Sequence, residues 1–368
     1  MPPTFAYAEN RCSPFHSQED GKNMRNPYIS FLQAFGIVLV VVGHAFPSDG
    51  HELLLYRWIY SFHMPLWVFL SGYLLRYTAP EAAREGACPL AGIPLGPFVA
   101  KKARRLLIPY LLLSTLVFVP KALLSRWAVK PVELSWSAYV EMLLVPSKNV
   151  IVYYWFLPTL FILLTGTVLF AKSLARMPFA ASGRVPLGVW VVVALVFSVF
   201  NPVGGVAWLN LSGVAKFGFF FVLGIFYCSR QTQIDRALIL DHPWTVPGWG
   251  ATSVAGILTG YASLDPLCER LAAVCGILFA LALGKAYLRS GRRLLAALDG
   301  STYAIFLFSW FPQSALRVVL YDYGGVTPWI GVPLSTAAGI ALPWLLRRGL
   351  LWGKRWRAGR ILAAGCGQ

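Results

Sequence analysis

Apolar stretches long enough to cross a lipid bilayer recur along this chain from residue 29 onwards. They restrict the fold to that of a protein embedded in a membrane. A transmembrane helix needs about 20 mainly apolar residues. Proline, glycine and charged residues separate the stretches at 29–46, 57–78, 106–123, 151–171, 187–200, 207–228, 246–262, 267–288, 302–320 and 328–346. Hydrophobic residues make up 57% of the chain and charged residues only 13%, which is too little polar surface for a soluble domain of this size. We therefore predict an all-α, polytopic integral membrane protein with about ten transmembrane helices.

The distribution of Lys and Arg predicts how these helices are oriented. Cytoplasmic loops carry an excess of Lys and Arg, whereas Asp and Glu influence the orientation little. When residues 1–28 are placed inside, most of the 32 Lys and Arg residues fall in the alternate segments on that same side. Both termini are therefore predicted to be cytoplasmic, in a multi-pass protein of the inner (plasma) membrane. This bias, together with contacts to anionic membrane lipids, accounts for the net charge of +17, so no nucleic-acid partner is expected.

The segments outside the apolar stretches complete the expected domain organisation. Residues 1–27 are polar and contain no apolar core, so we expect a disordered cytoplasmic tail and not a cleaved signal peptide. Residues 28–346 form the membrane domain, and residues 347–368 form a basic cytoplasmic tail. Residues 124–150 are amphipathic and are interrupted by prolines, which places them along the outer interface. Two interpretations of this segment stay open, a surface patch and a lid over an external site.

Neither a disulfide nor a metal site is expected. The chain contains six cysteines without a Cys-x-x-Cys pair, and most of them fall in predicted cytoplasmic or inner-end segments, where thiols stay reduced. It also has no Walker loop, no dinucleotide glycine signature and no His-Glu-x-x-His motif. These absences favour chemistry carried out by ordinary side chains within the membrane domain.

Two histidines are candidates for that chemistry. His44 lies near the end of the first apolar stretch, where packing does not require an imidazole. Histidine takes up and returns protons near neutral pH, and an ionisable residue at membrane depth is a candidate functional residue. His63 lies below the outer surface on the second predicted helix, at nearly the depth of His44. The structural alternatives are a hydrogen-bonded His44, and a His63 that bonds a carbonyl freed by Pro65.

Helix geometry relates His44 to Gln33. The two residues are eleven positions apart, which is about three helical turns, so they share one face and are separated by about 16 Å along the axis. One polar group therefore points toward the inner half of the membrane and the other toward the outer half.

Basic residues mark two further positions. Four of them gather at the predicted cytoplasmic mouth of the third helix, namely Lys101, Lys102, Arg104 and Arg105. Such a cluster suits phosphate groups, although clusters of this kind also serve only as topology signals. Lys216 falls within the sixth predicted helix, where snorkelling to an interface is difficult. We therefore expect Lys216 to face the interior of the bundle.

Three motifs in the first third of the chain resemble the acyltransferase 3 family. They are the Gly43-His44 pair, the run from Phe62-His-Met-Pro-Leu66 to Phe69-Leu-Ser-Gly-Tyr73, and Phe98-x-x-Lys-Lys-x-Arg-Arg-Leu-x-Ile-Pro-Tyr110. Weaker similarities follow at residues 154–158, 219–224 and 301–310, so the resemblance extends from about Tyr28 to Leu346. It implies a ten-helix membrane enzyme that moves an acyl group, commonly acetyl from acetyl-CoA, onto a hydroxyl of a cell-surface carbohydrate.

The resemblance also implies that His44 is catalytic, and it exposes two departures from the family pattern. The family usually has a basic residue eleven positions before this histidine, where this chain has Gln33. An uncharged amide cannot clamp a phosphate or carboxylate as a guanidinium does, so any donor contact there is weakened or moved. Ser309 stands where many relatives carry histidine.

Acyl transfer from a thioester to a sugar hydroxyl needs a base, stabilisation of an anionic tetrahedral species, and positive charge for the phosphates of coenzyme A. His44 is the best base, with His63 beside it, and Lys216 would face the donor or the oxyanion. The basic cluster and Gln33 would hold the acetyl-CoA co-substrate. The candidates for contact with the carbohydrate acceptor are Asp49, Glu52, Ser71 and Trp155. Loop carboxylates are commonly just solvated, and aromatic residues at helix ends are commonly interfacial anchors, so these alternatives stay open.

A transporter is the main rival class, as a carbohydrate or lipid carrier of a cell-envelope polysaccharide pathway. Proton-coupled carriers usually relay protons through buried Asp or Glu, and no carboxylate of this chain lies deep inside an apolar stretch. Carriers also tend to show paired broken helices in two halves, which this sequence lacks. A membrane-bound O-acyltransferase is therefore the predicted function, with a carrier or a non-catalytic assembly subunit as the alternatives.

Overall fold

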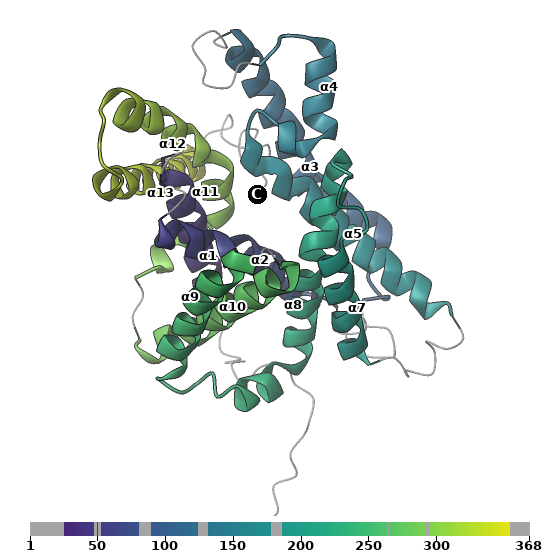
Figure 1. Cartoon of the computed structure of the whole chain (residues 1–368). Helices are drawn as coiled ribbons and strands as arrows, with labels where there is room; N and C mark the ends of the chain where they lie inside the picture. Colours follow the sequence, from purple (N-terminus) through teal and green to yellow (C-terminus); the bar gives the residue numbers. More distant parts are fainter. Residues whose placement is uncertain are drawn as a thin grey trace, which may run out of the picture.

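The structure of the protein is a computed structural model that describes residues 26–47, 50, 53–80, 90–123, 132–177, 186–263, 265–291 and 294–353. Helices connected by short loops make up this part of the chain, and it contains no β-strand. α1 (Pro27–Ala45) and α2 (Leu54–Tyr77) lie in the middle of the bundle, with the other helices around them (Figure 1). The all-α prediction is confirmed for these residues.

Each of the ten predicted segments coincides with a helix or with a pair of consecutive helices. After α1 and α2 these are α3 (Leu95–Leu123), α5 (Phe156–Ala175), α7 (Leu187–Phe200), α8 (Leu211–Ala237), α9 (Thr245–Ser263), α10 (Pro266–Arg289), the pair α11 (Thr302–Phe308) and α12 (Trp310–Arg317), and α13 (Pro328–Gly353). α13 continues past residue 346, where the basic tail was expected to begin. The rest of that tail, and residues 1–25 of the N-terminal tail, lie outside the described residues.

Six of the described helices are long and apolar enough to cross a membrane, which makes this a multi-pass membrane protein. They are α1, α3, α5, α8, α10 and α13, and α11 with the bent continuation through α12 would make a seventh. α7 has only 14 residues, and α2 carries two arginines and a histidine that lower its hydropathy. A total of ten spans stays a prediction.

α1 has clear local signals at both ends. The side chain of Asn26 accepts a hydrogen bond of 2.9 Å from the backbone N–H of Tyr28, and Pro27 occupies the first turn, where its missing N–H costs nothing. Phe46 is extended because Pro47 follows it. Most residues of α1 are buried, so this helix is a central element on which the site is built.

Two glycines set the packing of α2 against α8. A Cβ atom on Gly72 would lie 2.0 Å from the carbonyl oxygen of Phe221, and a Cβ on Gly224 would lie 2.0 Å from the carbonyl oxygen of Phe69. Small residues let helix backbones approach this closely inside a membrane, where apolar packing replaces the hydrophobic effect as the driving force. The two helices are thereby held in direct backbone contact.

A buried ion pair joins α8 to α10 at the predicted cytoplasmic end. Lys285 Nζ lies 2.7 Å from Asp235 Oδ2, and the side chains are only 14% and 9% exposed. The hydroxyl of Tyr227 donates a hydrogen bond of 2.7 Å to the other carboxylate oxygen. Asp235 is therefore a paired carboxylate within the helix end, which gives no support to a proton relay.

The segment expected at the outer interface is partly described. Residues 124–131 lie outside the described residues. The following α4 (Trp136–Leu144) is a nine-residue helix, which is too short to span a bilayer. Tyr110 of α3 donates hydrogen bonds to the carbonyls of Met142 and Leu143, so α4 lies against α3.

Cys228, Cys268 and Cys275 are free thiols in the structure. Among the described residues, no group of three or more His, Cys, Asp or Glu side chains is arranged to hold a metal ion.

Candidate functional site

A cavity of about 630 Å³ surrounds His44, and we call it the His44 cavity. Its wall is built from α1, α2, α8, α9, α10 and α11 and from the 3-10 turn η5 (Val152–Trp155). Aromatic and ionisable side chains share this wall, including His44, Tyr60, His63, Tyr153, Trp155 and Lys216. This volume lies in the range of ordinary ligand sites.

Tyr60 and Tyr153 fix the imidazole of His44. Its Nδ1 atom lies 2.9 Å from the hydroxyl oxygen of Tyr60, and its ring stacks on Tyr153 with 3.5 Å between the ring centroids. When Nδ1 carries the proton and donates it to the Tyr60 oxygen, Nε2 keeps a lone pair that can accept a proton. The imidazole is then oriented as a base.

His63 approaches His44 as the sequence predicted. The two imidazole centroids are 6.3 Å apart, and the His63 side chain is buried. Its Nδ1 lies 2.8 Å from the carbonyl oxygen of Ile59, so Nδ1 carries the proton and donates it. The expected bond to a carbonyl is present, but the carbonyl is that of Ile59, one turn before His63, and not the one that Pro65 leaves unbonded.

Three side chains from the C-terminal half hold the last turn of α1 in place. Gln313 Nε2 donates a hydrogen bond of 2.7 Å to the carbonyl of Val41. Arg317 Nη2 donates to the carbonyls of His44 (3.0 Å) and Phe46 (3.1 Å). These carbonyls belong to the end of a helix, where four acceptors lack partners within the helix and positive charge is stabilising.

The third of these side chains is Tyr321, whose hydroxyl donates a hydrogen bond of 3.0 Å to the carbonyl of Ala45. It lies in η8 (Val318–Tyr323), a π-helical segment that continues α12. π-Helical turns occur frequently at functional sites. Sequence reasoning missed this set of contacts, although Arg317, a basic residue inside the predicted span 302–320, was a usable signal.

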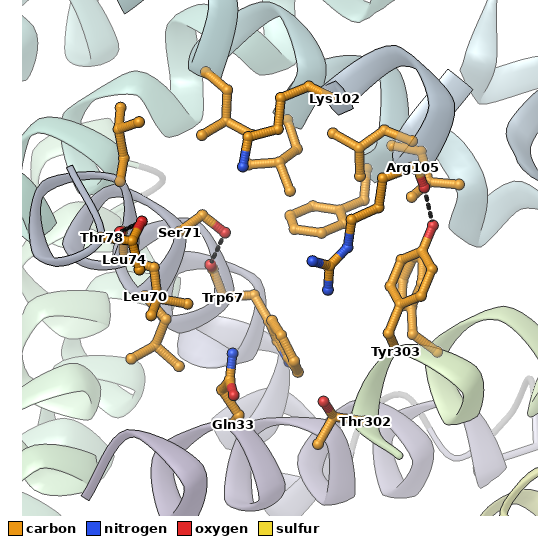
Figure 2. Close-up of a pocket in the computed structure, with 17 residues that line it drawn as sticks. Gln33, Trp67, Leu70, Ser71, Leu74, Thr78, Lys102, Arg105, Thr302 and Tyr303 are labelled. Atoms are coloured by element: carbon orange, nitrogen blue, oxygen red, sulfur yellow. Dashed lines mark hydrogen bonds between the residues drawn. The ribbon is translucent and has the colours of Figure 1, made fainter. Parts of the chain in front are cut away.

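A second cavity, of about 160 Å³, lies around Gln33, and we call it the Gln33 cavity. Figure 2 shows Lys102 and Arg105 extending from α3 into the space bounded by Gln33, Trp67, Ser71 and Tyr303. The Arg105 guanidinium lies 5.1 Å from the centre of the Tyr303 ring, and the Tyr303 hydroxyl donates a hydrogen bond to the Arg105 carbonyl. An arginine and a lysine thus converge on one small cavity.

The structure divides the predicted basic cluster into two pairs. Lys102 and Arg105 are three residues apart on one face of α3, and both line the Gln33 cavity. Lys101 and Arg104 do not line this cavity, and Arg105 is as exposed as they are, so the cavity lining and not the exposure separates the pairs. Chain neighbours that look equivalent in the sequence therefore differ in what they can contact.

The two cavities follow one another along α1 and α2. Gln33 and His44 lie on the same helix, and one belongs to each cavity. Trp67 lines the Gln33 cavity, while Met64, one turn earlier on α2, lines the His44 cavity. Phe306 of α11 lines both, so the cavities are neighbours.

Lys216 lines the His44 cavity, but it is less buried than the sequence suggested. α8 begins at Leu211 and not at residue 207, so Lys216 lies in the second turn and not near the middle of the helix. Its side chain is 45% exposed, and Nζ lies 3.4 Å from Glu269 Oε2. Lys216 therefore faces the interior cavity as expected, but it does so from near the start of α8 and not from the middle of the span.

The proposed acceptor contacts are separated in the structure. Trp155 lines the His44 cavity and stacks on Phe217, with ring centroids 5.2 Å apart. Ser71 lines the Gln33 cavity, where its hydroxyl donates a hydrogen bond of 2.8 Å to the Trp67 carbonyl. Ser71 is eight residues beyond His63 on α2, which is about 12 Å along the axis. Asp49 and Glu52 lie outside the described residues.

A family model described as an acyltransferase domain matches residues 26–348. The nodulation protein NolL of Mesorhizobium japonicum (strain LMG 29417 / CECT 9101 / MAFF 303099) is 27% identical over 234 residues, which cover 61% of this chain and 53% of that protein. The chain thus spans about half the length of this relative. No solved structure matches this chain.

Proposed function

Because this chain belongs to the acyltransferase 3 family, we propose that it is a membrane-bound O-acyltransferase that moves an acyl group from acyl-CoA to a hydroxyl of a cell-surface or exported carbohydrate. Acetyl is the proposed acyl group. One observation carries the proposal: an oriented histidine lines one cavity, and two cationic side chains line the neighbouring cavity along the same two helices.

The donor is proposed to bind from the Gln33 cavity. Lys102 and Arg105 supply positive charge for the phosphates of coenzyme A, and Arg105 can bind a phosphate with two parallel N–H groups. Gln33 is uncharged, but its amide can donate to and accept from the amide groups of the pantetheine arm. The arm then extends past Trp67 and Phe306 toward His44, which lies about 16 Å from Gln33 along the axis of α1.

The acceptor hydroxyl is proposed to meet the thioester in the His44 cavity. Nε2 of His44 takes the hydroxyl proton while the hydroxyl oxygen attacks the thioester carbonyl carbon, and a tetrahedral intermediate forms. Its collapse breaks the C–S bond, and the departing thiolate receives the proton from the imidazolium. Tyr60 keeps the ring oriented through Nδ1 in both steps.

The two basic pairs of α3 give a matched test of the donor site. Replacing Lys102 and Arg105 together with Gln is expected to raise the KM for acetyl-CoA about tenfold or more and to change kcat little. Phosphates remote from the reacting thioester contribute mainly uniform binding, and a hydrogen bond to a charged group contributes about 1.5–3 kcal/mol. Steady-state kinetics in nanodiscs, with acetyl-CoA varied and with equal amounts of folded protein, measure the effect.

The control is the same double substitution at Lys101 and Arg104, which removes equal charge from the same turns without touching the cavity. It is expected to keep the wild-type KM. If both doubles behave alike, or if both retain the wild-type KM and insert in the wrong orientation, the four residues are topology signals.

Arg317 is expected to act on the rate through the backbone of His44. Arg317→Gln removes charge-assisted hydrogen bonds to two carbonyls at the end of α1 and should lower kcat about tenfold, with the KM for acetyl-CoA unchanged. Arg317→Lys keeps the charge and should restore part of kcat. An equal loss in both variants, or a change confined to KM, would contradict this positioning role.

A further inference from the structure

Cations gather in the wall of the His44 cavity at a place where the membrane topology does not require them. Arg57, Lys216 and Arg270 line this cavity, and Glu269 is the one carboxylate among its described lining residues. All three cations lie near the starts of their helices, α2, α8 and α10. These helix starts are on the predicted outer side, where Lys and Arg are depleted. A topology signal therefore does not account for the cluster.

Glu269 is shared between two of these cations. Arg270 Nη1 lies 2.7 Å from Glu269 Oε2, and Lys216 Nζ lies 3.4 Å from the same oxygen. One carboxylate cannot neutralise two cations, so this group of three keeps a net positive charge. The contact of Lys216 with Glu269 is the longer and therefore the weaker of the two. The Lys216 ammonium is thus the group that can more readily bind another anion.

Arg270 and Lys216 differ in how firmly they are held. The Arg270 side chain is buried, and besides Glu269 it bonds the Ser198 hydroxyl (3.2 Å) and the Ser198 carbonyl (3.0 Å). Three acceptor atoms on two residues fix its position in the wall. The Lys216 side chain is 45% exposed, and its ammonium contacts Glu269. Arg270 thus anchors the group, and Lys216 is the less constrained charge, which has room to approach a ligand.

Aromatic rings face the same space. Tyr56, Tyr60, Tyr153 and Trp155 all line the cavity, and tyrosine and tryptophan combine an apolar face with a polar edge. Such faces suit the apolar side of a sugar ring. These aromatic rings, together with the net positive charge of the Lys216, Glu269 and Arg270 group, suit a saccharide that carries an anionic group.

We propose that the acceptor is an anionic saccharide, whose carboxylate or phosphate binds at Lys216 and the adjoining Arg270–Glu269 pair while a hydroxyl reaches His44. This inference rests on the proposed acyl transfer and goes beyond it, because it specifies the charge of the acceptor. Lys216 is a specificity residue in this scheme, and it takes no part in the transfer of the proton.

The test compares three acceptors that differ in one substituent: methyl glucoside, methyl glucuronide and methyl glucoside 6-phosphate. Purified full-length protein in nanodiscs receives labelled acetyl-CoA and each acceptor in turn. The glucuronide and the phosphate are expected to exceed the neutral glucoside in kcat/KM by about 10- to 100-fold, the size of a charge-assisted hydrogen bond. Preference between the two anionic compounds identifies the group as carboxylate or phosphate.

Lys216→Gln should remove this preference by raising the KM for the anionic acceptors. The KM for acetyl-CoA should not change, and the ratio of kcat/KM between the anionic acceptors and methyl glucoside should fall toward one. Lys148→Gln is the matched control, because Lys148 pairs with Glu141 at an exposed site and does not line the cavity. It should leave all three acceptors unaffected.

The outcomes separate this inference from the proposed function. Transfer to methyl glucoside at a rate equal to or above that of the anionic pair overturns the anionic acceptor and leaves acyl transfer standing. An unchanged preference in Lys216→Gln also overturns it. Absence of transfer to all three acceptors, by protein that binds acetyl-CoA, contradicts the proposed function and this inference together.

Discussion

His44→Ala is expected to lower acyl transfer by about 10²- to 10⁴-fold, the contribution of a positioned general base, while the protein remains folded in the membrane. The imidazole is oriented by Tyr60 and Tyr153, and its removal leaves the acceptor hydroxyl without a group to take its proton. The measurement is the rate of labelled acetyl transfer by purified protein at saturating acetyl-CoA.

The folded state of this variant needs its own check, because His44 lies at the end of a buried helix. Size-exclusion elution and thermal unfolding should match the wild type within experimental error. His242→Ala is the control, since His242 lies on an exposed turn away from both cavities, and its activity should be normal. Near-normal transfer by a well-folded His44→Ala protein would remove His44 from the mechanism.

The second large effect is on folding: Gly72→Val should leave little folded protein. A Cβ at this position would lie 2.0 Å from the Phe221 carbonyl oxygen, which is a backbone atom that cannot swing aside, so α2 and α8 must separate. Overpacking of this kind costs typically 1–3 kcal/mol and occasionally more, and a branched side chain at a backbone contact falls at the upper end. Fluorescence-detected size exclusion after mild solubilisation measures the folded fraction.

Gly224→Val should behave in the same way, because it blocks the same crossing from the other helix. Gly166→Val on α5 is the control, since a Cβ there meets nothing within 4 Å. If Gly72→Val and Gly166→Val gave equal folded fractions, the close contact between α2 and α8 would not be needed for folding.

Hydropathy and helix geometry were sufficient for much of the architecture. Every predicted apolar segment falls on a helix, because a bilayer forces the backbone to satisfy its own hydrogen bonds. The pairing of His44 with His63 was also predictable, since consecutive helices of known direction bring residues of equal depth together. Gln33 was grouped with the basic cluster through the family resemblance, and in the structure it lines the same cavity as Lys102 and Arg105.

The rotation of each helix about its axis and the residues at which each helix begins and ends were harder to predict from the sequence. Leu209 and Asn210 both adopt left-handed backbone conformations just before α8, and nothing in their hydropathy marks that break, so the depth of Lys216 was misjudged. Dividing the basic cluster of α3 into the pair that lines the Gln33 cavity and the pair that does not required knowledge of how that helix is rotated about its axis. The hydrogen bond from Arg317 to the carbonyl of His44 joins residues 273 positions apart. No local sequence pattern predicts a contact of this kind.

The wall shared by the two cavities has a consequence for permeability. Phe306 belongs to both linings, so in the proposed mechanism this aromatic side chain stands in the wall between the cavity that receives the donor from the cytoplasm and the cavity that receives the acceptor from the exterior. A carrier must swing whole domains to prevent such a passage from leaking ions. Here the acyl group and the slender pantetheine arm are all that pass the ring, and a ring packed against the arm can exclude water while the donor is bound. The thioester then supplies the driving force for modifying an external sugar, and the membrane potential is left intact.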